Sequence, residues 1–84
     1  MYSVYILQSK KNKSIYVGYS SNIKKRVEEH QKGGVFSTRE MLPVEIIYCE
    51  LYKNKKDAIR REQYLKTGWG RNYIRKILKN TLDN

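Results

Sequence analysis

The sequence predicts a small α/β fold with the element order β-β-α-β-α-α, in which helices flank a three-stranded sheet. Two observations predict it. Three runs rich in β-branched and aromatic residues have the character of strands, and the segments between them carry helix caps and helical periodicity. The 84 residues contain no linker, repeat or low-complexity stretch. We therefore expect residues 1–84 to form a single domain.

The predicted elements follow one another closely, with short polar turns between them. They are strands at residues 2–8, 15–19 and 44–52 and helices at residues 23–32, about 54–67 and about 71–78, with a loop through Arg39 and Pro43 before the third strand. Ser20, Ser21 and Asn22 offer N-terminal caps to the first helix, and Gly33 with Gly34 ends it.

The first two strands form a hairpin across the polar turn at residues 10–13. If the connection has an even residue count, Tyr5 and Tyr16 point to the same face of the sheet, with Gly18 beside them. That face would carry two phenols next to a stretch of bare backbone.

Charge indicates the class of partner. Eighteen Lys and Arg oppose eight Asp and Glu, for a net charge of +10, and a polyanion would relieve the resulting self-repulsion. The exposed lysines of residues 10–13 and 53–56 are expected contributors to nucleic-acid affinity. Solubility alone is the simpler explanation, and a membrane surface fits less well because no helix sets basic residues opposite one clean apolar face.

Length and cysteine content limit the possible sites. A chain this short has one thin core, so we expect any active site to lie in a shallow surface groove. Cys49 is the only cysteine, which excludes an internal disulfide and a cysteine-rich zinc site and favours a reducing, cytoplasmic location. No stretch has the features of a signal peptide or a membrane span.

Polar residues occupy helix positions where apolar ones belong. On a helical wheel Glu62 falls in the middle of an apolar arc, and Arg26 and His30 lie at the rim of another. A buried carboxylate needs an arginine, a metal ion or a hydrated groove to compensate it. The simpler alternatives are an ion pair with a neighbouring Arg for Glu62 and ordinary packing for His30.

These residue types suit phosphodiester hydrolysis. A carboxylate can hold Mg²⁺ against a phosphate, and an arginine offers two parallel donors to it. A tyrosine could take a proton from water if nearby cations lowered its pKa, and we expect such a lowering in this basic chain. The signatures of a Ser/His/Asp hydrolase, a P-loop and a Rossmann turn are absent from the sequence.

The ordered set of residues resembles the GIY-YIG endonuclease pattern over nearly the whole chain. The matching residues are Ser3-Val4-Tyr5, Tyr16-Val17-Gly18, Arg26, His30 and Glu62. The chain is most similar to small stand-alone bacterial members, and the same module occurs in an excision-repair nuclease and in intron-encoded homing endonucleases. Ser3 replaces the first Gly of the motif, and Tyr19 stands where the repair nuclease has a Lys.

The resemblance implies a role for each matching residue. Tyr5 would be the general base, and Tyr16 would help to hold water or phosphate. Arg26 would stabilise the developing phosphorane and His30 would assist Tyr5 or bind phosphate, while Glu62 would be the single protein ligand of Mg²⁺ or Mn²⁺. The implied substrate-binding positions are Gly18, where substrate or backbone could approach closely, Thr38 with the adjacent Arg39, and Asn72.

The resulting hypothesis is a Mg²⁺-dependent endonuclease that cuts DNA with low sequence specificity, in repair or another form of DNA processing, as a monomer or weak homodimer. Tyr5, Tyr16, Arg26, His30 and Glu62 should then converge on one solvent-reachable groove. The main alternative is a non-catalytic nucleic-acid-binding module on the same scaffold. A basic adaptor that docks to an acidic protein is a third possibility.

Overall fold

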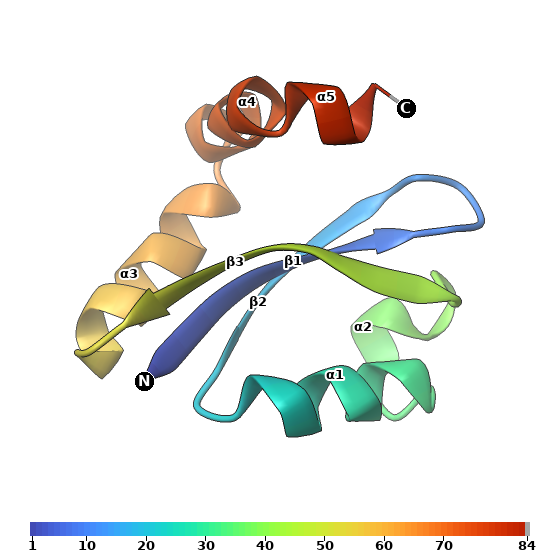
Figure 1. The fold of residues 1–84 in the computed structure, drawn as a ribbon, viewed down its shortest axis with the longest axis horizontal. Helices are drawn as coiled ribbons and strands as arrows, with labels where there is room; N and C mark the ends of the chain where they lie inside the picture. The colour runs from blue at the N-terminus through green and yellow to red at the C-terminus, as the bar shows by residue number, and fades with distance from the viewer. Residues whose placement is uncertain (84) are drawn as a thin grey trace.

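The computed structural model describes residues 1–83 and confirms the predicted α/β class (Figure 1). Its elements in chain order are β1 (Tyr2–Ser9), β2 (Ile15–Ser20), α1 (Ile23–Gln31), α2 (Phe36–Arg39), β3 (Val44–Tyr52), α3 (Lys55–Leu65), α4 (Gly68–Ile77) and α5 (Lys79–Leu82). None of these helices has the length and apolar content needed to cross a membrane.

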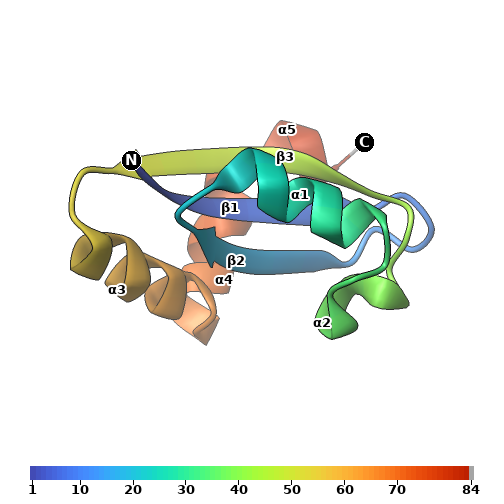
Figure 2. The same cartoon turned by 90° about the horizontal axis from the view of Figure 1, so that it is seen from below.

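The sheet is antiparallel with the strand order β2-β1-β3, so β1 is central and buried along nearly its whole length. Alternation along β1 separates two apolar clusters. Val4 and Ile6 pack with residues of α3 and α4, whereas Tyr5 and Leu7 belong to the cluster on the face that carries α1. Figure 2 shows α1 in front of the sheet with α4 and α5 behind it. The prediction that Tyr5 and Tyr16 share a face is confirmed, because Tyr5 pairs with Gly18 and Leu7 pairs with Tyr16.

Side-chain caps set where the helices begin. Asn22 accepts a hydrogen bond from the Lys25 backbone N–H at 3.2 Å, and Asn54 accepts one from the Lys56 N–H at 2.8 Å. Both caps satisfy a backbone donor that has no partner inside its helix. After α1 the chain turns at Gly33, whose φ of +77° is a conformation that suits glycine.

Two details of the prediction were wrong. The segment expected to be a loop before β3 contains the short helix α2, which places Thr38 under α1. The last helix was expected near residue 71 but begins at Gly68, because the Thr67 side chain caps it by accepting from the Gly70 N–H at 3.1 Å. It ends at Ile77, and α5 follows as a separate turn.

Candidate active site

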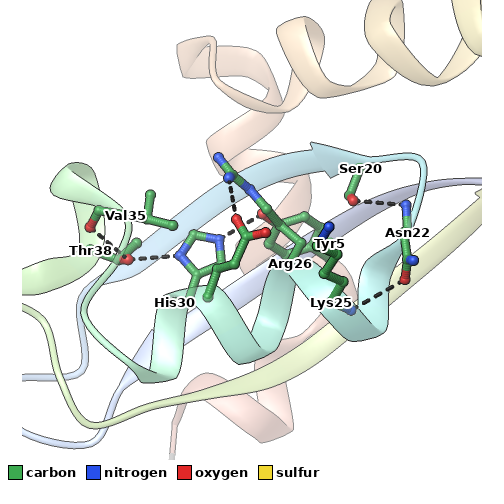
Figure 3. A network of polar contacts seen from close by, with 9 residues as sticks. Tyr5, Ser20, Asn22, Lys25, Arg26, His30, Val35 and Thr38 are labelled. Carbon is green, nitrogen blue, oxygen red and sulfur yellow. Dashed lines mark hydrogen bonds and ion pairs between the residues drawn. The ribbon is translucent and has the colours of Figure 1, made fainter.

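A chain of buried polar side chains joins β1, α1 and α2 (Figure 3). The Tyr5 hydroxyl lies 2.7 Å from Nε2 of His30, and His30 Nδ1 lies 2.7 Å from Oγ1 of Thr38. Thr38 in turn donates to the backbone carbonyl of Val35 at 3.4 Å. Tyr5, His30 and Thr38 are each 0 % exposed. These three side chains therefore satisfy one another away from bulk water.

The arrangement of donors fixes the tautomer of His30. The proton of the Tyr5 hydroxyl needs an acceptor, and Arg26 beside it has only donors. His30 Nε2 supplies that acceptor, so the His30 proton lies on Nδ1 and is donated to Thr38. The Thr38 hydroxyl is then free to donate its own proton to Val35. Every donor in the chain has an acceptor in this assignment.

Burial sets the pKa of both ring systems. It raises the pKa of Tyr5 to about 12, although the hydrogen-bonding donors and charge of Arg26 act in the opposite direction. Burial also lowers the pKa of His30, and the positive charge of Arg26 lowers it further. The expectation that cations would lower the Tyr5 pKa was wrong, because desolvation of a buried phenolate outweighs one neighbouring guanidinium.

The strand β2 contributes Tyr16 and Gly18. The Tyr16 ring lies 6.5 Å from the Tyr5 ring and 5.3 Å from the His30 ring, centre to centre. A Cβ on Gly18 would overlap Cζ and Oη of Tyr5. Gly18 was expected to let substrate or backbone approach closely, but the group that lies against it is the Tyr5 side chain.

Arg26 comes from α1 and stands partly exposed beside Tyr5. Its Nη1 is 3.0 Å from Oε2 of Glu29, one helical turn away. The Arg26 side chain keeps 38 % of its exposure and that of Glu29 keeps 43 %, so this ion pair is hydrated and weak. A phosphate could therefore take the place of Glu29 at modest cost.

Glu62 lies on α3, and no hydrogen bond or ion pair in the described residues joins it to Tyr5, Arg26 or His30. Its negative charge raises the pKa of Tyr5, although less than burial does, which places its carboxylate within electrostatic reach of the phenol. The Glu62 side chain is 18 % exposed and pairs with Lys66 at 3.0 Å. The alternative of an Arg partner was wrong, because the i,i+4 spacing on α3 gives Glu62 a half-exposed lysine instead.

Tyr5, Tyr16, Arg26 and His30 thus come together, whereas Glu62 is linked to them only through its charge, and the five do not share one solvent-reachable groove. The Tyr5 hydroxyl lies beneath the rings and guanidinium that surround it and is buried. A shallow depression of about 280 Å³ opens beside Arg26. It is lined by Ser20, Ser21, Asn22, Lys25, Arg26 and Glu29.

The three remaining residues that were expected to bind substrate make contacts within the protein instead. Thr38 was expected to contact substrate, but it is buried and holds His30. Arg39 is exposed on α2, where its Nε donates to the Gly33 carbonyl at 3.0 Å. Asn72 is exposed on α4 and accepts a hydrogen bond from Arg75. No hydrogen bond in the described part of the chain joins Arg39 or Asn72 to Tyr5 or His30.

The donor set at the site is compatible with one kind of metal ion. Within residues 1–83 no three His, Cys, Asp or Glu side chains gather into a ligand cluster. A single carboxylate such as Glu62 suits Mg²⁺ or Mn²⁺, because Mg²⁺ keeps several waters and uses one or two carboxylates together with substrate phosphates.

The comparisons with known proteins agree with this geometry. Residues 1–74 match the family described as the GIY-YIG catalytic domain, and the chain belongs to that family. The family relationship makes the fold nuclease-like and makes nucleic acid the expected class of partner.

Within it, the chain is similar to UPF0213 proteins. It is 42 % identical over 64 residues to one from Clostridium perfringens, which covers 75 % of this chain and 68 % of the relative. It is 40 % identical over 65 residues to one from Staphylococcus haemolyticus, which covers 76 % and 78 %. No solved structure matches the chain.

The sequence alone did not reveal the role of Thr38, whose contact with His30 depends on how α2 folds back. It did contain a signal for the ion pairs of Arg26 and Glu62. The partners Glu29 and Lys66 stand three and four positions further along their helices, where helical side chains meet.

Proposed function

We propose that the chain is a divalent-metal-dependent endonuclease that hydrolyses phosphodiester bonds in DNA. The observation that carries the proposal is the buried chain from Tyr5 through His30 to Thr38, with Arg26 beside Tyr5 and the charge of Glu62 within electrostatic reach of it. Buried polar groups need partners in any fold, but these three form one continuous line of hydrogen bonds that includes a tyrosine and a histidine, and such a line can carry a proton.

In the proposed reaction His30 is the final proton acceptor. A water molecule loses a proton to the Tyr5 oxygen while the Tyr5 proton passes to Nε2 of His30. The water oxygen attacks phosphorus, and the bond from phosphorus to the leaving oxygen breaks. Because Tyr5 receives a proton as it gives one up, no free phenolate forms, and the step is compatible with a Tyr5 pKa of about 12.

Arg26 would bind the phosphate. Its guanidinium can donate two parallel hydrogen bonds to phosphate oxygens and counter the charge that develops on them. In the free protein it pairs with Glu29, so substrate binding would exchange a hydrated carboxylate for a phosphate. Such an exchange would shift the guanidinium that stands beside the buried Tyr5 hydroxyl, giving water a route to it.

Glu62 would hold the metal ion, which when bound supplies Lewis-acid stabilisation of charge on the phosphate and the leaving oxygen. Lys66 would release Glu62 for this purpose. These contacts all address phosphate rather than base edges, so the proposal includes low sequence specificity. A role in DNA repair or processing, in a cytoplasmic setting, is the context that the family resemblance suggests.

The burial of Tyr5 favours one alternative, a module that binds nucleic acid without cutting it. Both hypotheses predict binding, and they differ in what Glu62 does. The chain offers a matched pair of variants for the test, because Glu62→Gln and Lys66→Gln break the same ion pair while only the first removes the carboxylate.

Cleavage of plasmid and linear DNA with Mg²⁺ and with EDTA, together with binding and thermal unfolding, should be measured on both variants. We expect Glu62→Gln to abolish cleavage while binding stays equal or tightens, because a negative charge leaves the phosphate-facing side. Lys66→Gln should keep its cleavage. Glu62 is 18 % exposed but Lys66 is half exposed, and an i,i+4 pair on one helix contributes only about 0.3–0.5 kcal/mol, so both variants should lose less stability than a variant that breaks the Arg61–Glu50 pair.

Two outcomes would count against the nuclease. Wild-type protein that binds DNA but cleaves none of these substrates with Mg²⁺ or Mn²⁺ supports the binding module. Equal loss of cleavage in both variants would assign the effect to the ion pair and not to a metal ligand.

A further inference from the structure

We propose that a basic groove between the β1–β2 turn and the C-terminal helices is a second binding site for the phosphodiester backbone. The groove encloses about 550 Å³, and its lining includes Gln8, Lys13, Ile15, Arg71, Arg75 and Leu82. None of the residues proposed for the reaction lines it. The inference rests on the proposed function in taking DNA as the ligand.

The groove carries a net positive charge and therefore favours binding of an anion. Lys13, Arg71 and Arg75 face a single acid, Asp83. Within residues 1–83 the ion pairs are Lys10–Glu45, Arg26–Glu29, Arg61–Glu50 and Lys66–Glu62, so none of the three groove cations is neutralised by a partner. Three cations gathered around one hollow repel one another, and a bound phosphate would relieve that repulsion.

The turn that carries Lys13 is held firmly. Gln8, only 6 % exposed, donates from Nε2 to the Lys13 carbonyl at 3.2 Å. Ser9 Oγ accepts from the backbone N–H groups of Lys11 and Asn12 at 3.1 and 3.3 Å. Lys13 itself has a φ of 67°, in the left-handed region, and these bonds hold it there. The Lys13 backbone is therefore positioned before any ligand binds.

The helix side of the groove is equally ordered. Arg71 and Arg75 lie one turn apart on the same side of α4, which packs through the buried Ile74 on the main core. Arg75 also donates to Asn72. Arginines presented in this way can each grip a phosphate with paired donors. Ile15 and Leu82 add apolar surface to the lining, against which a sugar could pack.

The groove and the candidate active site are three residues apart along the first two strands. In the β1–β2 ladder Gln8 pairs with Ile15 at the groove, and Tyr5 pairs with Gly18 at the candidate active site. The two sites lie on opposite faces of the sheet, because Ile15 packs with the α4 cluster and Tyr5 with the α1 cluster. β2 is an edge strand of the sheet, so a DNA backbone that contacts both sites would pass around this free edge.

Binding to a fluorescently labelled 20-base-pair DNA duplex in EDTA tests the groove without cleavage. The affinity should be measured across a salt series for wild type, Arg71→Gln/Arg75→Gln and the single variant Lys13→Asn, which keeps a residue that tolerates the left-handed backbone. The matched control is Lys76→Gln/Lys79→Gln. It removes the same charge from α4 and α5 at exposed positions outside the groove.

We expect the double groove variant to bind at least tenfold more weakly at low salt and to lower the slope of log affinity against log salt by about 2, at about 0.9 per lost phosphate contact. Lys13→Asn should lower the slope by about 1. The control should weaken binding no more than threefold and leave the slope within about 0.5 of the wild type. Equal slopes and affinities for the groove variants and the control would overturn the proposal.

Nuclear magnetic resonance locates the contact independently. The side-chain amide of Gln8 should shift when the same duplex is added to wild-type protein, because it lies in the groove wall. If adenosine monophosphate shifts this signal and the duplex does not, the groove is a site for free nucleotides and the proposal fails. The cleavage assay tests the proposed function separately. If the groove variants bind DNA more weakly than the control but the wild type cleaves no DNA, the groove is a binding site and the nuclease proposal fails. If the wild type cleaves DNA but the groove variants bind it as the control does, only the groove proposal is rejected.

Discussion

Two clusters of tyrosine and charged residues lie on opposite faces of the sheet. They differ in how many hydrogen bonds the arginine of each cluster makes and in how buried that arginine is. On the α3 face, Glu50 accepts two hydrogen bonds from Arg61 at 2.9 Å and one each from the hydroxyls of Tyr48 and Tyr52 at 2.6 and 2.8 Å. Arg61 also lies over the Tyr73 ring at 4.8 Å. Burial acts to raise the pKa of Glu50, but these hydrogen bonds outweigh it and the pKa is lowered.

On the α1 face, Arg26 has one carboxylate partner at 3.0 Å, and both side chains of that pair remain more than a third exposed. Arg61 and Glu50, by contrast, keep 24 % and 15 %. A guanidinium whose partners are fixed and buried stabilises the fold, and one that is loosely paired at the surface is available to a ligand. Residue type alone does not distinguish the two clusters, whereas the burial of each arginine and the number of hydrogen bonds it makes to its carboxylate do.

Removing the Tyr5 hydroxyl should give the largest effect on activity. Tyr5→Phe is expected to lower the cleavage rate by about 10²–10⁴-fold, since the proton path from water to His30 is lost. It leaves His30 Nε2 without its donor and should cost about 1–2 kcal/mol of stability. Single-turnover cleavage and urea unfolding on the same sample check both numbers. A variant that keeps more than a tenth of the wild-type rate would remove Tyr5 from the reaction.

Breaking the opposite cluster should give the reverse pattern. Arg61→Met leaves the Glu50 carboxylate largely buried without its ion-pair partner, and we expect about 3 kcal/mol of destabilisation. Cleavage per folded molecule should stay within about threefold of wild type, because the Arg61 guanidinium is engaged with Glu50 and the Tyr73 ring. Thermal unfolding and activity at low temperature give the two readouts. A stable but inactive Arg61→Met would mean that both clusters serve the reaction.

Thr38 should matter through His30 and not through the substrate. Thr38→Val keeps the shape of the side chain but removes the oxygen that accepts from Nδ1, so either His30 tautomer becomes possible. We expect about a tenfold lower rate and a shifted pH–rate profile with unchanged DNA affinity, and recovery in Thr38→Ser. Reduced affinity that Thr38→Ser does not restore would return Thr38 to a substrate-contacting role.

The pH dependence of stability should give the smallest effect. His30 has a lowered pKa in the folded state, so the unfolded chain binds the proton more readily. The contribution of neutral His30 to the free energy of unfolding is therefore complete above the pKa of histidine in the unfolded chain, about 6.5, and declines as the pH falls below that value. Urea unfolding from pH 8 to pH 5 should show this decline in wild type, and it should be weaker in His30→Gln. An identical decline in both would assign it to the carboxylates.

Local sequence determined the strands, most helix starts and the candidate residues. The alternation in β1 predicted which residues share a face, and Asn22 and Asn54 marked helix starts because a cap needs only the two or three residues that follow it. The 3.6-residue period also placed His30 on the buried side of α1. These features depend on neighbours in the chain, which a sequence shows directly.

Only the tertiary structure decided how buried and how satisfied each group is. The Tyr5 pKa was predicted to fall, but it rises, because the packing of β2 and α1 around the phenol removes water and desolvation outweighs the nearby charge. Thr38 was assigned to substrate and proved to hold His30, because α2 folds under α1. Partners distant in sequence set desolvation and hydrogen bonding, so composition and periodicity name the reactive groups but do not give their environment.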